Sequence, residues 1–289
     1  FLQFHPTSLY NPGERPSFLI SEAMRGFGAL LRLQNGKEFM HKYHPMGSLA
    51  PRDVVARSID HEMKISGDEF VYLDITHKDP KEVINHFPNI YQKCLSVGID
   101  LTKDMIPVVP AAHYCCGGVK VNLNGESSIR HLYALGETSS TGLHGGNRLA
   151  SNSLMEAAVY ADVAAQHAIS LLNTIELQRN IPAWDYEGTA IPEEMALITQ
   201  NYKEMQLIMS NYVGIVRSNL RLERAKRRLE IIFKETEELY LKSTLSQHLC
   251  ELRNMIAVGY LIIKQAEAMH ESVGLHYSID YPAKPVNME

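Results

Sequence analysis

Polar and charged residues gather beside glycine or proline in several short segments of the chain. Histidines occur in Gln3–Thr7 and Pro110–Gly118, arginines in Ser21–Gly26 and Ala50–Asp53, and both residue types in Thr141–Glu156. Arginine binds a carboxylate through two parallel hydrogen bonds, and histidine adds a directional donor near neutral pH. These segments therefore predict a site that binds a dicarboxylate.

In their order along the chain, the segments resemble motifs of the flavoprotein family of succinate dehydrogenases, fumarate reductases and L-aspartate oxidases. The L-aspartate oxidase branch is the most similar, and the resemblance covers nearly the whole chain. The motifs that carry it are Ala111–Tyr114, Arg148–Leu154, Tyr212–Arg217, Gly274–Tyr277 and Asp280–Pro282. One departure is Val273, where the branch commonly has an arginine of structural rather than chemical importance.

The resemblance implies a cofactor, a reaction and partners. The cofactor is FAD, and the reaction oxidises L-aspartate to iminoaspartate with oxygen or fumarate as electron acceptor. This is the first step of de novo NAD biosynthesis via quinolinate, so quinolinate synthase is implied as the partner that consumes iminoaspartate. We also expect a cytoplasmic location, because the four cysteines fit reduced thiols in a cytoplasmic protein.

The resemblance also implies substrate contacts for His5, Ser21, His113 and Arg148. The guanidinium of Arg148 stays charged and can bind one end of aspartate. Read from the residues alone, Arg148 could form a surface salt bridge, and both histidines could be satisfied core residues. Glycines flank Arg148, and proline or a glycine pair lies close to each histidine, which favours the site interpretation.

Arg52, Glu22 and Arg25 resemble the catalytic relay of the fumarate-reducing relatives, in which the first arginine delivers a proton to carbon. Glu22 and Arg25 are three residues apart and share one face of a helix. No C3 proton moves in aspartate oxidation, so we expect Arg52 to hold charge and geometry there and to act as an acid toward fumarate. The alternative is an ordinary ion pair of Glu22 and Arg25, stabilising by about 0.2–0.5 kcal/mol.

The implied cofactor contacts lie in the glycine loop and at the start of the helix that follows it. Glu137 resembles the carboxylate that binds the ribityl hydroxyls of the flavin, and a helix beginning near Ser151 suits the negative charge of a reduced flavin. Simple N-capping by the serines is an alternative that can hold as well. The full set is Glu137, His144, Asn147, Ser151, Asn152, Ser153 and Leu154.

The phosphate-binding part of a dinucleotide site is missing from the sequence. No G-x-G-x-x-G follows an expected strand, and Gly26-Phe27-Gly28 lacks both the third glycine and the preceding strand. Phe1 lies inside an expected strand without an initiator methionine. We therefore interpret the chain as a C-terminal part without the N-terminal dinucleotide-binding half, and expect it to be inactive on its own.

Periodicity and the resemblance together indicate an α+β chain in three regions. Residues 1–114 are expected to form the capping (substrate) domain, residues 115–184 the C-terminal part of an FAD-binding α/β domain, and residues 185–289 an all-α helical bundle. The expected local elements are a helix from Pro51, a strand over Phe70–Ile75, a helix over Pro80–Phe87, alternation over Gly118–Asn122, a turn at Asn124–Gly125, a buried strand over Leu132–Gly136, a loop over Glu137–Asn147 and a helix from Ser151.

Bulk composition excludes several classes of protein. The 289 residues are 45% hydrophobic and 21% charged, which is ordinary for a globular protein. A net charge of −5 gives no reason to expect nucleic acid or an anionic membrane as partner, and no run of apolar residues is long enough to span a bilayer. The four cysteines lack metal-ligand spacing, so we expect reduced thiols and no metal site.

Two other functions remain open on the sequence. The chain could belong to a soluble fumarate reductase or succinate dehydrogenase flavoprotein, although His113-Tyr114 and Gly274–Tyr277 argue against it. It could also be a non-catalytic fragment whose helices dock a partner. The amphipathic stripe over Leu249–Ile263 is by default domain core, which argues against a docking role.

Overall fold

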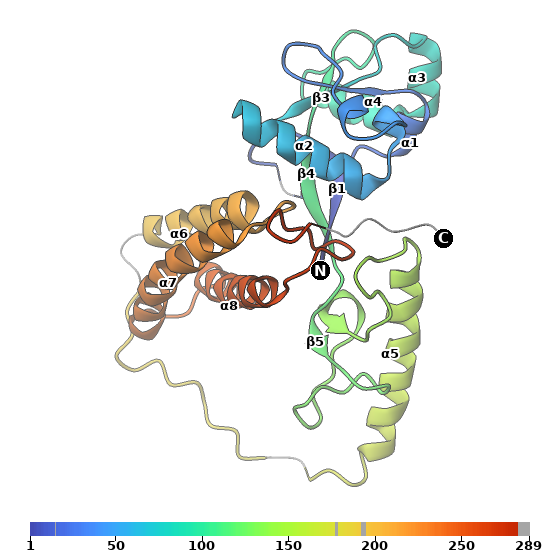
Figure 1. Cartoon of the computed structure of the whole chain (residues 1–289). Helices are drawn as coiled ribbons and strands as arrows, with labels where there is room; N and C mark the ends of the chain where they lie inside the picture. The colour runs from blue at the N-terminus through green and yellow to red at the C-terminus, as the bar shows by residue number, and fades with distance from the viewer. Residues whose placement is uncertain (15, 177–178, 192–194, 283–289) are drawn as a thin grey trace. The chain divides into compact units, whose positions relative to one another are not determined.

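The fold mixes strands and helices, which confirms the α+β class (Figure 1). The chain separates into two compact units, Phe1–Cys116 and Gly117–Glu289. A computed structural model describes residues 1–14, 16–176, 179–191 and 195–282. The predicted division into three domains stays a prediction, and parts of its last two regions, residues 177–178, 192–194 and 283–289, lie outside the described residues.

The first unit is built on an antiparallel sheet with strand order β1-β4-β3-β2. Its strands are β1 (Leu2–Leu9), β2 (Leu30–Arg32), β3 (Val71–Asp74) and β4 (Ile106–Cys115). In the long β1–β4 pair, His5 lies opposite Ala111 and Gln3 opposite Tyr114. The register shifts twice, between Gln3 and Phe4 and between His5 and Ser8. Such irregularities redirect side chains out of strict alternation, and they occur often near functional sites.

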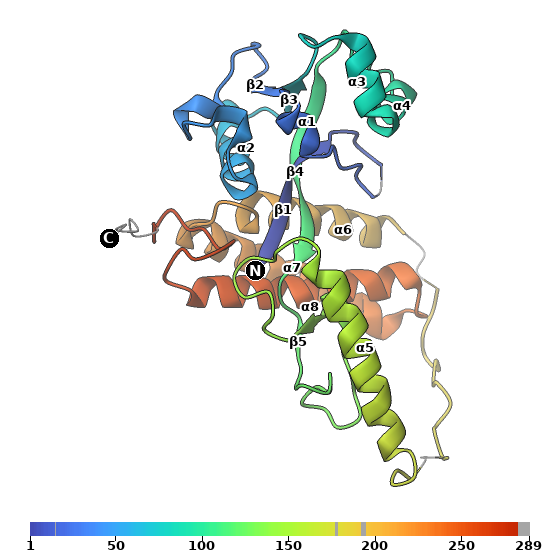
Figure 2. The same cartoon turned by 90° about the vertical axis from the view of Figure 1, so that its right-hand side faces the viewer.

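Helices cover this sheet and enclose an apolar core. They are α1 (Ala23–Gly26), α2 (Arg52–Ser66), α3 (Pro80–His86) and α4 (Pro88–Ser96), with short 3-10 turns η1 (Met40–Lys42) and η2 (Gly47–Leu49). Figure 2 shows α2 and the α3–α4 pair on opposite sides of β1 and β4. Ile59 of α2, Leu73 of β3 and Ile106 of β4 are fully buried in one cluster. The helices predicted from Pro51 and Pro80 are confirmed. Helix α2 begins directly after Pro51, and α3 begins at Pro80, where proline suits the first turn.

The first part of the second unit has less regular structure than predicted. It contains β5 (Val119–Lys120), η3 (Gly136–Thr138), β6 (Ser139–Ser140) and α5 (Asn152–Leu171). The predicted buried strand over Leu132–Gly136 is wrong: this segment forms a single bridge, from Tyr133 to Glu126, and Leu132 is 48% exposed. A strand needs a hydrogen-bonded neighbour along its length, and among the described residues only the short stretch Gly125–Ser127 pairs with this segment.

Three long helices form the bundle predicted for the last part of the chain. They are α6 (Ala196–Ile208), α7 (Asn219–Lys242) and α8 (Gln247–Ala268), with a π-helical turn η4 (Met209–Val213) after α6 (Figure 1). Ser218 and Ser246 cap α7 and α8 through their side chains. Within the Leu249–Ile263 stripe, Leu252 and Ile256 are buried against α6 and α7, as domain core requires.

Two further structural findings concern membranes and metals. Among the described residues, no helix combines the length and the apolar character needed to cross a membrane. In the same ranges, no group of three or more His, Cys, Asp or Glu side chains lies close enough to hold a metal ion. None of the four cysteines, all of which lie in the described ranges, forms a disulfide.

The start of α3 provides a test of how this unit is stabilised. The Asp79 carboxylate accepts hydrogen bonds from the Lys81 and Glu82 amides. Asp79→Ala removes the cap, so we expect the free energy of unfolding to fall by about 1 kcal/mol in urea denaturation followed by circular dichroism. Asp79→Asn is the matched control, because asparagine caps equally well. If Asp79→Ala and Asp79→Asn lowered the free energy of unfolding equally, the hydrogen-bonding cap would contribute nothing to stability.

Candidate active site

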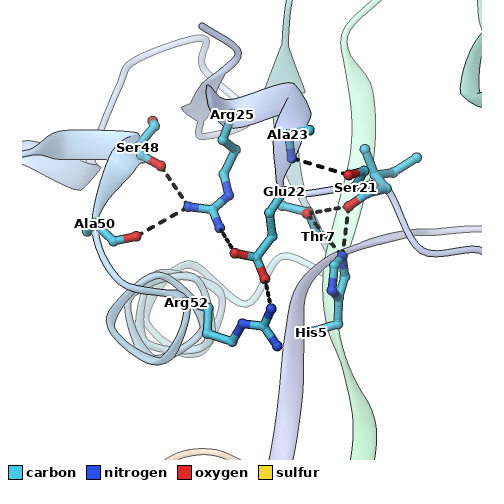
Figure 3. Close-up of polar contacts among 10 residues, drawn as sticks. His5, Thr7, Ser21, Glu22, Ala23, Arg25, Ser48, Ala50 and Arg52 are labelled. Atoms are coloured by element: carbon cyan, nitrogen blue, oxygen red, sulfur yellow. Dashed lines mark hydrogen bonds and ion pairs between the residues drawn. The ribbon is translucent and has the colours of Figure 1, made fainter. Parts of the chain in front are cut away.

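His5 lies near the middle of β1, buried against the segment that precedes α1. Its Nε2 atom is 2.7 Å from the Ile20 carbonyl oxygen, and the Thr7 hydroxyl donates to the same oxygen at 3.1 Å (Figure 3). A carbonyl only accepts, so Nε2 carries the proton. Burial lowers the pKa of His5, although the Ile20 hydrogen bond and the Glu22 charge raise it in part. The imidazole is therefore neutral at neutral pH.

His113 on β4 contacts His5 edge to face. Their ring centroids are 5.9 Å apart at an interplanar angle of 61°. The β1–β4 pairing causes this contact, since it places His5 opposite Ala111, two residues before His113. Unlike His5, His113 is exposed. Two histidines far apart in the sequence thus meet at one place, with one buried and the other accessible.

Glu22 lies between two guanidinium groups. Its Oε2 atom is 3.1 Å from Nη2 of Arg25, and its Oε1 atom is 2.7 Å from Nη2 of Arg52 (Figure 3). The Arg25 side chain is only 4% exposed and also donates to the Ser48 carbonyl at 2.8 Å. Burial lowers the pKa of Arg25, and Glu22 opposes that effect. Glu22 and Arg25 thus form the i,i+3 pair of the alternative interpretation, but Arg25 is buried, so removing Glu22 would leave a buried cation without its carboxylate.

Arg52 occupies a position that helix stability alone does not favour. It is the first residue of α2, directly after Pro51, and a positive charge there opposes the positive end of the helix dipole. The ion pair with Glu22 offsets this cost. Ser21 adjoins this ion-pair cluster, is exposed, and accepts a hydrogen bond from the Ala23 amide at 3.2 Å (Figure 3).

In the second unit, Arg148 joins the glycine loop to the start of α5. Its Nη1 atom donates to the Ser153 hydroxyl at 2.9 Å. Ser151 occupies the N-cap position with φ +79° and makes no side-chain capping hydrogen bond. The simple N-capping alternative is thus wrong for Ser151. A residue other than glycine in this left-handed region is uncommon and is found often at functional sites.

Glu156 is a residue to which the sequence analysis gave no role. Its side chain is 2% exposed, its Oε2 atom is 2.8 Å from Nε2 of His144, and it accepts a hydrogen bond from the Thr141 hydroxyl. The His144 side chain is itself 7% exposed, so Glu156 fixes it from the interior. Helical spacing could have revealed this acid, because Glu156 and the buried Ala164 lie eight residues apart on one face of α5.

The remaining predicted cofactor residues are also in the second unit. Glu137 is exposed in η3, Asn147 is exposed in the glycine loop, and Leu154 is 79% exposed on α5. Asn152 begins α5 and is half-buried. An accessible carboxylate and a helix N-terminus without a side-chain cap fit the hydroxyls and the negatively charged ring edge of a flavin.

Comparison with protein families gives two matches. The family described as FAD binding domain matches residues 1–154, and the family described as fumarate reductase flavoprotein C-term matches residues 202–285. The first match spans more than half of the chain. The chain therefore belongs to the FAD-binding domain family, and the cofactor of that family is FAD.

Curated relatives resemble the chain along nearly all of its length. L-aspartate oxidase of Pseudomonas aeruginosa is 51% identical over 282 residues, which are 98% of this chain and 52% of the relative. L-aspartate oxidase of Yersinia pestis is also 51% identical, over 98% of this chain and 53% of the relative. A chloroplastic L-aspartate oxidase of Nicotiana tabacum is 44% identical, over 98% and 47%. The chain spans about half the length of these relatives.

Solved structures confirm the architecture. A quinol-fumarate reductase with menaquinol molecules superimposes with a TM-score of 0.81 at 29% identity, covering 99% of this chain and 55% of that one. The Sdh1 complex of Mycobacterium smegmatis with UQ1 gives a TM-score of 0.80 at 30% identity, covering 99% and 51%. The predicted relationship to flavoproteins of this group is therefore confirmed.

The buried His5 ring generates a prediction about pH. Because its folded pKa lies below the ordinary 6.5, the unfolded chain takes up the proton first as the pH falls. The stability contributed by neutral His5 is complete above that range and is lost as the pH falls from about 6.5 toward the lower folded value. Histidine ring ¹⁵N spectra of the protein, assigned with His5→Gln, should show His5 titrating below its value in urea. Titration at or above the urea value would contradict the lowered pKa of the buried ring.

Proposed function

We propose that this protein is an FAD-dependent L-aspartate oxidase, which converts L-aspartate to iminoaspartate with oxygen or fumarate as electron acceptor. One observation carries the proposal: the catalytic and substrate residues predicted in the first unit cluster as His5–His113 and Arg25–Glu22–Arg52. They do so in a chain that is 51% identical to proteins named L-aspartate oxidase. These contacts within the first unit support the proposal, because histidine and arginine are side chains that bind carboxylates.

Substrate binding is proposed to rest on Arg148, His113, His5 and Ser21. Arg148 can bind a carboxylate through two parallel hydrogen bonds, and its contact with Ser153 restricts its orientation. His113 is accessible and can donate to a carboxylate, while His5 packs against its ring and keeps its own proton on Nε2. A neutral, buried His5 orients His113 without adding a second buried cation.

FAD is proposed to be held by Glu137, His144, Asn147 and the start of α5, Ser151 to Leu154. When bound, its flavin ring supplies the acceptor for the hydride that leaves the α-carbon of aspartate. Glu137 is placed to bind hydroxyl groups because it is exposed, and Glu156 holds His144 in one orientation. The positive end of the dipole of a 20-residue helix favours negative charge at its start.

Glu22 and its two arginines are proposed to serve the fumarate half of the reaction. Glu22 contacts both guanidiniums, so a proton can pass between Arg25 and Arg52 through one carboxylate. Arg52 would then protonate carbon as fumarate is reduced. In aspartate oxidation no such proton is needed, and Arg52 supplies positive charge and geometry only.

The product defines the proposed place in metabolism. Iminoaspartate is unstable, so a second enzyme must consume it, and we propose quinolinate synthase in this role. The reaction would then be the first step of NAD biosynthesis in the cytoplasm.

The substrate assignment is tested with Arg148→Leu in the full-length enzyme. Losing hydrogen bonds between charged groups should lower kcat/KM for aspartate by about 10- to 150-fold, measured by peroxide formation. Arg227→Leu, which removes a 75% exposed side chain, is the control and should leave kcat/KM unchanged. Normal turnover by Arg148→Leu would refute the anchoring role, and peroxide formed from succinate but not aspartate would instead favour a succinate dehydrogenase or fumarate reductase.

The relay is tested with Glu22→Gln, which keeps the shape of the side chain and removes its charge. Fumarate reduction should fall by roughly 10²- to 10⁴-fold, the usual loss when proton transfer is removed. Aspartate-dependent oxygen consumption should fall far less, because that half-reaction needs no proton from Arg52. Glu223→Gln, which breaks an exposed pair with Arg227, is the control. Equal losses in both assays would leave Glu22 a purely structural role.

A further inference from the structure

The structure brings together two sequence motifs that have no part in the chemistry above, Tyr212–Arg217 and Gly274–Tyr277. The residues Arg217 and His276 are 5% and 2% exposed, and Nη1 of Arg217 lies 2.7 Å from Nδ1 of His276. Arginine only donates hydrogen bonds, so Nδ1 accepts and His276 is neutral. Burial, followed by the charge of Arg217, lowers the pKa of His276, which keeps the ring in this state.

Backbone hydrogen bonds extend this contact along the segment 273–281, called here the C-terminal segment. The Arg217 amide donates to the Tyr277 carbonyl, and the Ile279 amide donates to the Arg217 carbonyl, both at 3.0 Å. The Asn219 amide at the start of α7 donates to Oδ2 of Asp280 at 2.6 Å. The C-terminal segment is therefore fixed to the entrance of α7 on both sides of Arg217.

The other end of the C-terminal segment contacts the glycine loop. Val273 and His276 close a tight turn by mutual backbone hydrogen bonds, and the Leu275 amide donates to the Gly146 carbonyl at 2.9 Å. Gly274 has φ +56°, and a Cβ atom there would lie 2.4 Å from the same carbonyl oxygen. Only glycine permits this approach. Gly146 precedes Arg148 by two residues, so the contact lies directly beside the proposed substrate anchor.

We propose that Arg217 and His276 are positioning residues, which through Gly274 and Leu275 hold the glycine loop so that Arg148 is set for the substrate carboxylate. The proposal rests on the substrate role proposed for Arg148. Burying a guanidinium costs several kcal/mol, and an apolar pair of similar volume often stabilises a core at least as well. The acceptors of Arg217, Val213 O and His276 Nδ1, are both uncharged. The burial of Arg217 is thus explained by the position that it imposes on the C-terminal segment rather than by the stability of the bundle.

The test uses Gly274→Ala in the full-length enzyme, with Gly188→Ala as the matched control. Both glycines have positive φ, +56° and +79°, but a Cβ atom at Gly188 meets nothing within 4 Å. The two variants share the backbone strain and differ in the contact with Gly146. Gly274→Ala should raise KM for aspartate roughly tenfold or more, because small misplacements of a binding group are costly. The same change should appear in the Kd of malonate, an unreactive dicarboxylate, while Gly188→Ala leaves both values unchanged.

A double-mutant cycle shows whether the effect passes through Arg148. In an Arg148→Leu background, Gly274→Ala should add no further rise in KM, since the group that it misplaces is gone. Arg217→Met should reproduce the rise, and Arg217→Lys, which keeps a donor for His276, should restore part of the affinity. If the Arg217 variants fail to fold, the Gly274 cycle decides alone.

The outcomes separate this inference from the proposed function. Unchanged KM in Arg148→Leu would refute the substrate role of Arg148 and with it this inference. A raised KM in Arg148→Leu, with normal KM in folded Gly274→Ala, would overturn only the positioning role. Additive effects in the double variant would also overturn it, because Gly274 would then act through another group.

Discussion

The pairing of β1 with β4 is the constraint on which the first unit depends. These strands come from opposite ends of the unit, and their hydrogen bonds close it around one apolar core. The register shifts in β1 place His5 inward and bring its ring to His113. A slip by one residue would turn the side chains of β1 to the other face. The sheet therefore fixes the core and the histidine pair with the same hydrogen bonds.

Buried charge imposes the next level of order. In the first unit, the Arg25 guanidinium is buried and is matched by Glu22, which also binds Arg52. In the second unit, Glu156 is buried and is matched by His144. A buried charged side chain requires one partner in one orientation, whereas an apolar contact tolerates many arrangements. The residues nearest to the proposed chemistry are thus the ones with the least freedom.

Local signals made much of this structure predictable. Pro80 is the first residue of α3 and Pro51 lies directly before α2, so both prolines marked helix starts, and the apolar spacing of the last third predicted the bundle. The predicted strand over Leu132–Gly136 failed because its apolar run had no neighbouring strand to pair with. The contact of Glu156 with His144 depends on how a loop folds back over α5, and the left-handed Ser151 on the same path. The left-handed backbone and the contact with His144 leave no periodic signal in the sequence, although the burial of Glu156 follows helical spacing.

The contact of Leu275 with Gly146 has a consequence for the order in which the protein is completed. These two residues are far apart in the sequence, and the C-terminal segment leaves the ribosome after every helix of the bundle. The glycine loop therefore gains this hydrogen bond only after the residues that follow α8 have been made. Closing so long a loop carries an entropic cost that the bundle must first offset. A chain that stopped before residue 273 would lack the amide that donates to the Gly146 carbonyl.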